Sequence, residues 1–177
     1  MISLEWLNDY VDIANIDPKD LAEKITKAGV NVEKIITNHI NNLVIGEVIE
    51  CENHPDSDHL HICKVNIGSK ILQIVCGAPN VRTGLKVIVA LNGAVLPGSV
   101  IKKGVIRGEE SNGMLCSMAE LGLEHKFLTE KDVNGIYELD SNAVVGEDPI
   151  KYLGLDDEVI DFELTSNRGD LLSILGM

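Results

Sequence analysis

The sequence predicts an α+β protein in which a small β-strand domain is inserted into a discontinuous α/β domain. Two observations support this prediction. Helical patterns occur only toward the two ends of the chain, whereas the middle contains a series of short apolar runs separated by Gly, Pro, Asn and Asp. These runs lie at residues 43–49, 60–67, 71–75, 86–91 and 99–106. Five short strands at this spacing are typical of a small β-barrel or sandwich.

The N-terminal segment contains two helix signals. Ser3 is a favourable N-cap for a short helix over residues 4–10. A second helix begins after Asp17, with Pro18 in the favoured first position, and ends before Gly29. Both helices therefore have recognisable starts, and the second also has a recognisable end.

The remaining elements complete the two predicted domains. VEKII at 32–36 reads as a strand before the barrel, and Gly46 permits a sharp curl in the first barrel strand. After Ser117 we expect a short helix at 118–123, a strand at 136–139, a helix at 149–155 and a strand at 158–164. A last helix should start near Ser166 or Asn167. We therefore place the discontinuous domain at residues 1–39 plus 150–177 and the barrel domain at 40–149. The last helical pattern is still running at Met177, so we expect a piece of a longer protein.

Charge is distributed unevenly. The chain of 177 residues has 15 Lys and Arg against 28 Asp and Glu, a net charge of −13. Residues 43–117 hold seven of each sign, so the flanks supply the whole excess of acid. A net negative charge opposes nonspecific nucleic-acid binding by the chain as a whole. Four cysteines, no signal-peptide pattern and no apolar run of membrane-spanning length predict a reduced, cytoplasmic protein.

The stretch HPDSDHLHICKV at 54–65 places three histidines and a cysteine within ten positions. One interpretation is a zinc site, although no CxxC or HxxxH pair is present. A second is a Cys–His nucleophile using Cys63, against which a buried cysteine is the simpler alternative. We favour a third, in which Asn53 to Asp56 form a turn at the barrel rim and His59 stands exposed beside it.

The middle of the chain also carries an ordered set of motifs. They are HP at 54–55, Asp58, Leu60, CKV at 63–65, QIVCGAPNVR at 73–82, GLKV at 84–87, PG at 97–98, IK at 101–102, RG at 107–108, SNGMLCS at 111–117 and ELGL at 120–123. This pattern resembles the tRNA-binding OB-fold module. The module usually has a basic residue where this chain has His59, which weakens the implied charge contact at neutral pH. The resemblance implies a five-stranded OB-fold barrel.

The flanks extend the resemblance to one family. MISLEWLNDYVDI at 1–13, GVNVE at 29–33, LTSNRGD at 164–170 and LSILG at 172–176 resemble the N-terminal part of the bacterial phenylalanine–tRNA ligase beta subunit. The family usually has Pro at the place of Ser166 and Ala at that of Gly169. The resemblance implies an (αβ)2 enzyme, with an alpha subunit and a second beta subunit as partners, that joins phenylalanine to its tRNA using ATP and Mg2+. It implies no catalytic residue, cofactor or metal in this segment.

An RNA-binding role has to be carried by few side chains. No Phe, Tyr or Trp lies between residues 43 and 117, so bases have no aromatic ring on which to stack there. The candidate tRNA-binding residues are His59, Lys64, Asn80, Arg82, Lys86, Lys102, Lys103, Arg107 and Ser111. We predict weak, auxiliary contact with phenylalanine tRNA. The alternatives are a purely structural module that packs subunits together and a tRNA-binding module of another synthetase.

Overall fold

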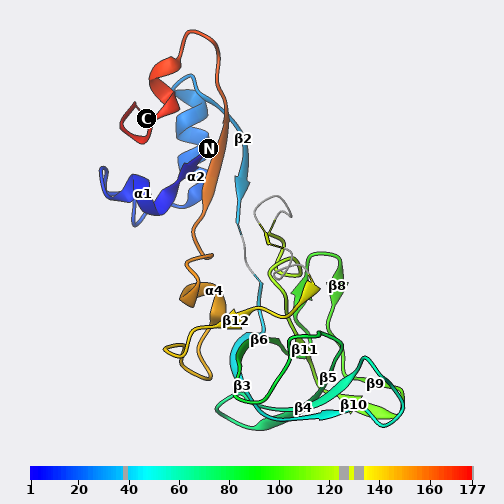
Figure 1. The fold of residues 1–177 in the computed structure, drawn as a ribbon. Helices are drawn as coiled ribbons and strands as arrows, with labels where there is room; N and C mark the ends of the chain where they lie inside the picture. Colours follow the sequence, from blue (N-terminus) through cyan, green and yellow to red (C-terminus); the bar gives the residue numbers. More distant parts are fainter. Residues whose placement is uncertain (38–39, 124–127, 130–133, 177) are drawn as a thin grey trace. The chain divides into compact units, whose positions relative to one another are not determined.

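The computed structural model describes residues 1–37, 40–123, 128–129 and 134–176. The chain forms two compact units, Met1–His39 with Gly154–Met177 and Ile40–Leu153 (Figure 1). The second unit extends four residues past the predicted boundary at 149. The reason is that the short helix α4 (Pro149–Tyr152) packs on strand β3 of the barrel, burying Pro149 and Ile150. No helix in the described part of the chain is long and apolar enough to cross a membrane.

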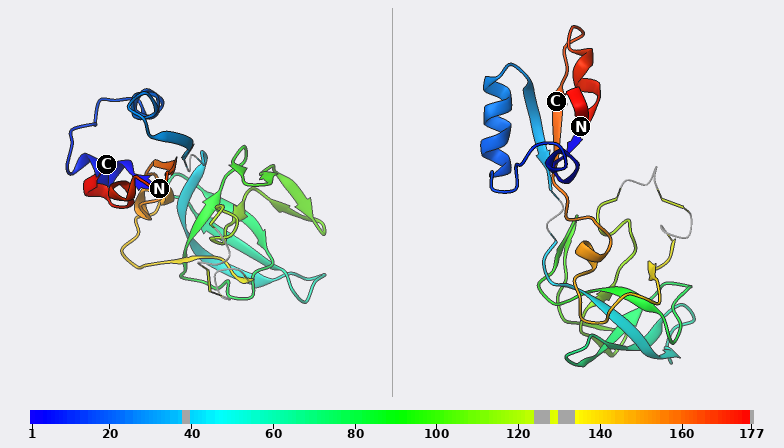
Figure 2. Two further views of the ribbon diagram at one scale, coloured as in Figure 1. Left: turned by 90° about the horizontal axis from the view of Figure 1, so that it is seen from above. Right: turned by 90° about the vertical axis from the view of Figure 1, so that its left-hand side faces the viewer.

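The first unit is built around a three-stranded antiparallel sheet in the order β1-β13-β2. Its strands are β1 (Ile2–Ser3), β13 (Val159–Glu163) and β2 (Asn31–Ile36). The central strand comes from the far end of the sequence, so the two separated segments are joined by backbone hydrogen bonds (Figure 2). The predicted discontinuous α/β arrangement is therefore the one observed.

Both predicted N-terminal helices form and are capped as expected. In α1 (Leu4–Asn8), the Ser3 hydroxyl accepts a hydrogen bond from Trp6 N at 3.0 Å. In α2 (Pro18–Lys27), the Asp17 carboxylate accepts one from Lys19 N at 2.9 Å. Each cap satisfies a backbone N–H that has no partner inside the helix. The small core of this unit contains Ile2, Leu7, Ile13, Ala22 and Ile160.

The last predicted helix does not form as an α-helix. Residues Gly169–Leu172 and Ile174–Gly176 instead form two short 3-10 helices, η2 and η3. The residue that precedes η2 is Arg168, which makes no side-chain cap hydrogen bond. The expected cap near Ser166 or Asn167 is therefore wrong.

The second unit is a nearly closed antiparallel barrel with strand order β11-β6-β3-β4-β5 (Figure 1). The strands are β3 (Leu43–Asn53), β4 (His61–Asn66), β5 (Ile71–Cys76), β6 (Lys86–Ala90) and β11 (Met114–Leu115). A further strand, β12 (Glu138–Leu139), pairs with the same edge of β6 as β11, opposite β3. The segment before β11 meets β5, where Asn112 N donates to Gln73 O at 2.9 Å. The predicted OB-fold barrel is confirmed.

The barrel core is aliphatic, as the scarcity of aromatic residues requires. Its fully buried side chains are Val48, Cys63, Val65, Ile74, Val87 and Val89. They come from β3, β4, β5 and β6 at alternate positions of each strand, because successive side chains of a strand point to opposite faces of the sheet.

The predicted fifth strand at 99–106 is wrong. These residues are divided between two hairpins that do not join the barrel sheet, β7 (Val95–Leu96) with β8 (Ser99–Val100) and β9 (Gly104–Ile106) with β10 (Glu109–Ser111). The run is interrupted between β8 and β9, and β11 takes the fifth place instead. A run of apolar residues predicted a strand here but could not predict with which strand it pairs.

The predicted helix at 118–123 is also absent and is replaced by turns. A capping interaction is nevertheless present, because Ser117 and Glu120 exchange hydrogen bonds. Glu120 N donates to Ser117 Oγ at 3.3 Å, and the Glu120 carboxylate accepts from Ser117 N at 2.6 Å. This is the bonding pattern of a capping box, here closing a turn.

Gly46 is the residue whose replacement should disturb the barrel most directly. An added Cβ would lie 2.7 Å from Val89 Cγ2 and 2.8 Å from Val65 Cγ1, both fully buried. We expect Gly46→Ala to lower the free energy of unfolding by about 1–3 kcal/mol through overpacking. Gly104→Ala is the matched control, because nothing lies within 4 Å of its added Cβ. Equal urea midpoints for both variants would contradict this account.

Candidate nucleic-acid interface

A groove with a volume of about 670 Å³ lies on the barrel unit. It lies between the end of β5, the loop at 100–102, the β9–β10 hairpin and Gly113 to Leu115. The lining is mainly apolar or glycine, including Leu60, Gly77, Ala78, Ile101, Ile106 and Met114. Of the predicted site residues, the groove brings together Lys102 and Ser111. Sequence reasoning missed the apolar lining, although the SNGM motif at 111–114 contributes to it.

Ser111 belongs to the barrel framework. Its side chain is buried, and its hydroxyl accepts from Val75 N at 3.1 Å and donates to Gly113 O at 3.0 Å. These bonds hold the segment before β11 against β5. The hydroxyl proton is thereby engaged, which disfavours the predicted donation to RNA.

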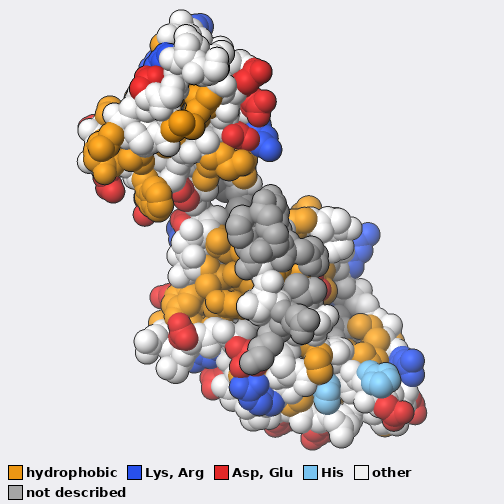
Figure 3. Space-filling view, turned by 45° about the horizontal axis from the view of Figure 1, so that its top comes forward, with side chains coloured by type: hydrophobic (Ala, Val, Ile, Leu, Met, Phe, Trp, Pro, Cys, Tyr) orange, Lys and Arg blue, Asp and Glu red, His pale blue; other side chains and the backbone are white. Residues whose placement is uncertain are grey.

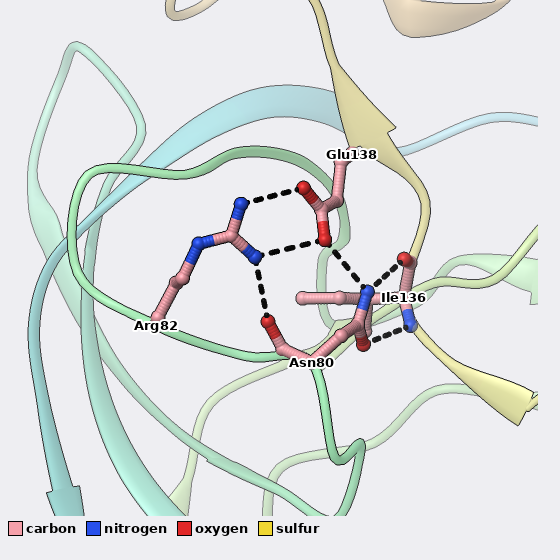
Figure 4. Close-up of polar contacts among 4 residues, drawn as sticks. All are labelled: Asn80, Arg82, Ile136 and Glu138. Carbon is pink, nitrogen blue, oxygen red and sulfur yellow. Dashed lines mark hydrogen bonds and ion pairs between the residues drawn. The ribbon is translucent and has the colours of Figure 1, made fainter. Parts of the chain in front are cut away.

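Asn80 and Arg82 form a cluster with Ile136 and Glu138 (Figure 4). The Asn80 side chain donates to Ile136 O at 2.9 Å and accepts from Ile136 N at 3.0 Å. Arg82 makes two hydrogen bonds to the Glu138 carboxylate, at 2.9 and 2.8 Å. The hydrogen bonds that Arg82 donates to the Glu138 carboxylate raise the pKa of Arg82 and keep it charged. This Asn80 cluster attaches the segment 135–139 to the loop before β6.

Three further predicted bases are engaged within the barrel unit. Lys64 lies 2.5 Å from the carboxylate of Glu50, its cross-strand neighbour, and Lys103 lies 3.0 Å from that of Glu110. Lys86 Nζ donates to the backbone carbonyls of Ser141 and Ala143, at 2.5 and 2.6 Å. Both ion pairs are exposed, so RNA could compete for these lysines, but in this structure their charge is balanced.

His59, Lys102 and Arg107 remain of the nine predicted residues. All three are exposed, and the described part of the chain offers none of them a carboxylate partner within ion-pair distance. Arg107 Nη1 donates to the backbone carbonyl of Asp56 at 2.9 Å, which joins the tip of the β9–β10 hairpin to the β3–β4 loop that carries His59. On the barrel unit in Figure 3, basic and acidic side chains are interspersed and no continuous basic area is visible.

The histidine-rich stretch folds as a turn followed by a strand. β4 begins at His61, so His59 lies in the turn and does not share a strand face with Cys63. The His54 side chain is buried, and its Nδ1 accepts from Asp56 N at 3.1 Å, which stabilises this turn. No group of three or more His, Cys, Asp or Glu able to hold a metal occurs among the described residues. The geometry agrees with the rim turn and not with a ligand set.

Cys63 points into the barrel core and lies 3.8 Å, sulfur to sulfur, from Cys51. Burial is the main cause that raises the pKa of Cys63, and it likewise raises the pKa of Cys116 to about 12. Because the thiolate is the nucleophilic form, both thiols are poorly reactive. This environment opposes a Cys–His nucleophile.

Asn80 gives a direct test of a structural against an RNA-binding role. Asn80→Ala removes its hydrogen bonds to Ile136 and Glu138, so we expect the free energy of unfolding to fall by about 2 kcal/mol. Arg82→Ala removes an exposed ion pair to Glu138 and an exposed hydrogen bond to the Asn80 carbonyl, and should change stability less. Urea unfolding of both variants measures this; an unchanged midpoint for Asn80→Ala would show that the cluster is not structural.

Thiol labelling should separate the cysteines. Cys51 is partly exposed, whereas Cys63, Cys76 and Cys116 are buried and have raised pKa values. With iodoacetamide at about pH 8 we expect Cys51 to react first in the folded chain, since labelling requires an accessible thiolate. Peptide mass spectrometry reads out each site, and labelling in urea is the control. Fast labelling of Cys63 in the folded chain would contradict its description as a buried, poorly reactive thiol.

The chain is similar in sequence to proteins of a known family. The family model described as "Putative tRNA binding domain" matches residues 43–148, which contain the barrel and its groove. The phenylalanine–tRNA ligase beta subunit of Geobacillus kaustophilus is 49% identical over 181 residues, which cover 100% of this chain and 22% of that protein. The beta subunit of Lactiplantibacillus plantarum is 48% identical, over 99% of this chain and 22% of that protein.

Among solved structures, the C-terminal domain of Plasmodium vivax p43 aligns with 62% of this chain and 59% of its own, at 26% identity and a TM-score of 0.43. The present chain spans about 22% of the length of the beta subunits that it matches. Its barrel belongs to the tRNA-binding domain family, and the whole chain is homologous to the N-terminal region of the bacterial phenylalanine–tRNA ligase beta subunit.

Proposed function

We propose that this chain is the tRNA-contacting N-terminal part of a phenylalanine–tRNA ligase beta subunit. The observation that carries the proposal is 49% sequence identity to a phenylalanine–tRNA ligase beta subunit over the full chain, together with the match of the tRNA-binding family model to the barrel. In the whole enzyme, (αβ)2, phenylalanine would be joined to its tRNA in the cytoplasm using ATP and Mg2+. This segment would contribute no catalytic residue and would hold no cofactor.

The barrel would act as an auxiliary arm. It offers an apolar groove and a small number of cations that no carboxylate of the described residues balances. Each phosphate contact contributes a slope of about −0.7 to −0.9 in log affinity against log salt, so one to three contacts give weak, salt-sensitive binding. Weak binding by this unit would add to, and not replace, the contacts made by the rest of the enzyme.

A second role is supported by the first unit. Trp6, Leu172 and Leu175 are 66%, 80% and 76% exposed, and exposed large apolar side chains that gather on one surface are typical of protein contact sites. Trp6 and Leu172 line the same apolar hollow. We propose that this surface packs against another part of the ligase, such as the alpha subunit or a second beta subunit.

The tRNA arm can be tested by fluorescence anisotropy with labelled phenylalanine tRNA and an unrelated tRNA at roughly 50 and 200 mM salt. We expect saturable binding that weakens with salt. The double variant Lys102→Ala with Lys103→Ala should lower the slope by about 0.7 per lost contact. The matched control is Lys24→Ala with Lys27→Ala, which also removes two exposed lysines, one of them paired with Glu23.

No binding at the lower salt would reject the tRNA arm and leave the packing role. Equal effects of the two double variants would mean that charge alone, and not the barrel surface, governs the affinity. Similar affinity for both tRNAs would place amino-acid specificity in another part of the enzyme.

A further inference from the structure

We infer that Arg107, at the tip of the β9–β10 hairpin, is the anchor for an RNA phosphate at the rim of the barrel. This inference rests on the proposed function and deepens it, since it assigns one contact of the tRNA arm to one side chain. Three independent features of the structure support it, namely charge, backbone conformation and position.

The first feature is charge. Lys64, Arg82 and Lys103 each have a carboxylate oxygen within 3.0 Å, so a phosphate would have to displace that partner first. Arg107 instead donates to a neutral carbonyl, that of Asp56, and has no ion pair with any described residue. As far as the described residues are concerned, its positive charge is therefore available to an anion without breaking an existing pair.

The second feature is the backbone. Arg107 and Gly108 are the two residues between β9 and β10, and their φ angles are +49° and +89°. Positive φ at both central positions defines a type I′ turn, where Asn and Gly are strongly preferred at the first position. An arginine is unfavourable there, since its Cβ disfavours a left-handed backbone. Residues held in such conformations are concentrated at functional sites.

The third feature is position. The hydrogen bond to Asp56 uses one of five guanidinium N–H groups and fixes the side chain against the β3–β4 loop. Its neighbour Ile106 lines the groove, as does Lys102. A strand whose phosphate binds the remaining N–H groups would place an adjoining base beside an apolar, glycine-lined hollow. The fixed guanidinium also loses less conformational freedom on binding than a free lysine does.

The test uses the full 177-residue chain, transcribed phenylalanine tRNA, and two readouts. The variants are Arg107→Asn, which suits the turn but lacks the charge, and Arg107→Lys, which keeps the charge. Lys70→Asn is the matched control, because Lys70 is also exposed. It precedes β5 at the opposite end of β4, about 20 Å away for six strand residues.

We expect Arg107→Asn to raise the melting temperature while weakening tRNA binding. Its ratio of Kd at 200 mM to Kd at 50 mM salt should be about threefold smaller than that of the unchanged chain, as loss of one phosphate contact requires. Arg107→Lys should keep the salt dependence, and Lys70→Asn should change neither readout by a comparable amount.

Two results would overturn the inference while leaving the proposed function intact. In the first, tRNA binds but Arg107→Asn alters the salt ratio no more than Lys70→Asn does. In the second, Arg107→Lys lowers the salt ratio as much as Arg107→Asn does, which would show that the positive charge at this position does not carry the contact. Absence of any tRNA binding by the unchanged chain would instead reject the proposed function itself.

Discussion

The barrel depends on one strand that pairs with two neighbours. β3 pairs with β6 through Leu43 to Glu47 and with β4 from Glu47 onward, with a register shift between Val48 and Glu50. The strand has to turn sharply where it changes partner. Gly46 lies at that point, with side chains of β4 and β6 so close that a Cβ has no room. This close approach brings side chains of β3, β4 and β6 together in one aliphatic core.

Polar contacts then fix the parts of the unit that the sheet does not hold. Ser111 attaches β11 to β5, the Asn80 cluster attaches the segment at 135–139, and Lys86 attaches residues 141–143. These are residues that the sequence pattern marks as RNA contacts. A polar side chain can either stabilise the fold or bind a ligand. When it is buried, or already makes two hydrogen bonds within the protein, it stabilises the fold. The candidate RNA interface therefore contains fewer residues than the nine that the sequence pattern indicated.

An element of this chain can be predicted from the sequence when its signal is local. The caps at Ser3 and Asp17 act over two or three residues, so they could be read directly. The OB-fold barrel could be inferred from motif order, and the need for Gly46 from its place in a strand. The pairing of Arg82 with Glu138, which lie 56 positions apart, has no local signature. The same holds for the fifth strand, where Met114 and Leu115 replaced a longer apolar run.

The central claim is that tRNA meets the barrel where the β3–β4 loop and the β9–β10 hairpin come together. The most direct measurement is a titration of the isotopically labelled chain with phenylalanine tRNA, followed through its backbone amide NMR signals. We expect the largest shifts or losses of intensity at residues 54–60 and 101–108, with little change in α2. Binding that leaves both segments unperturbed, or that mainly perturbs the strand surface around the ion pair between Glu50 and Lys64, would contradict this proposal.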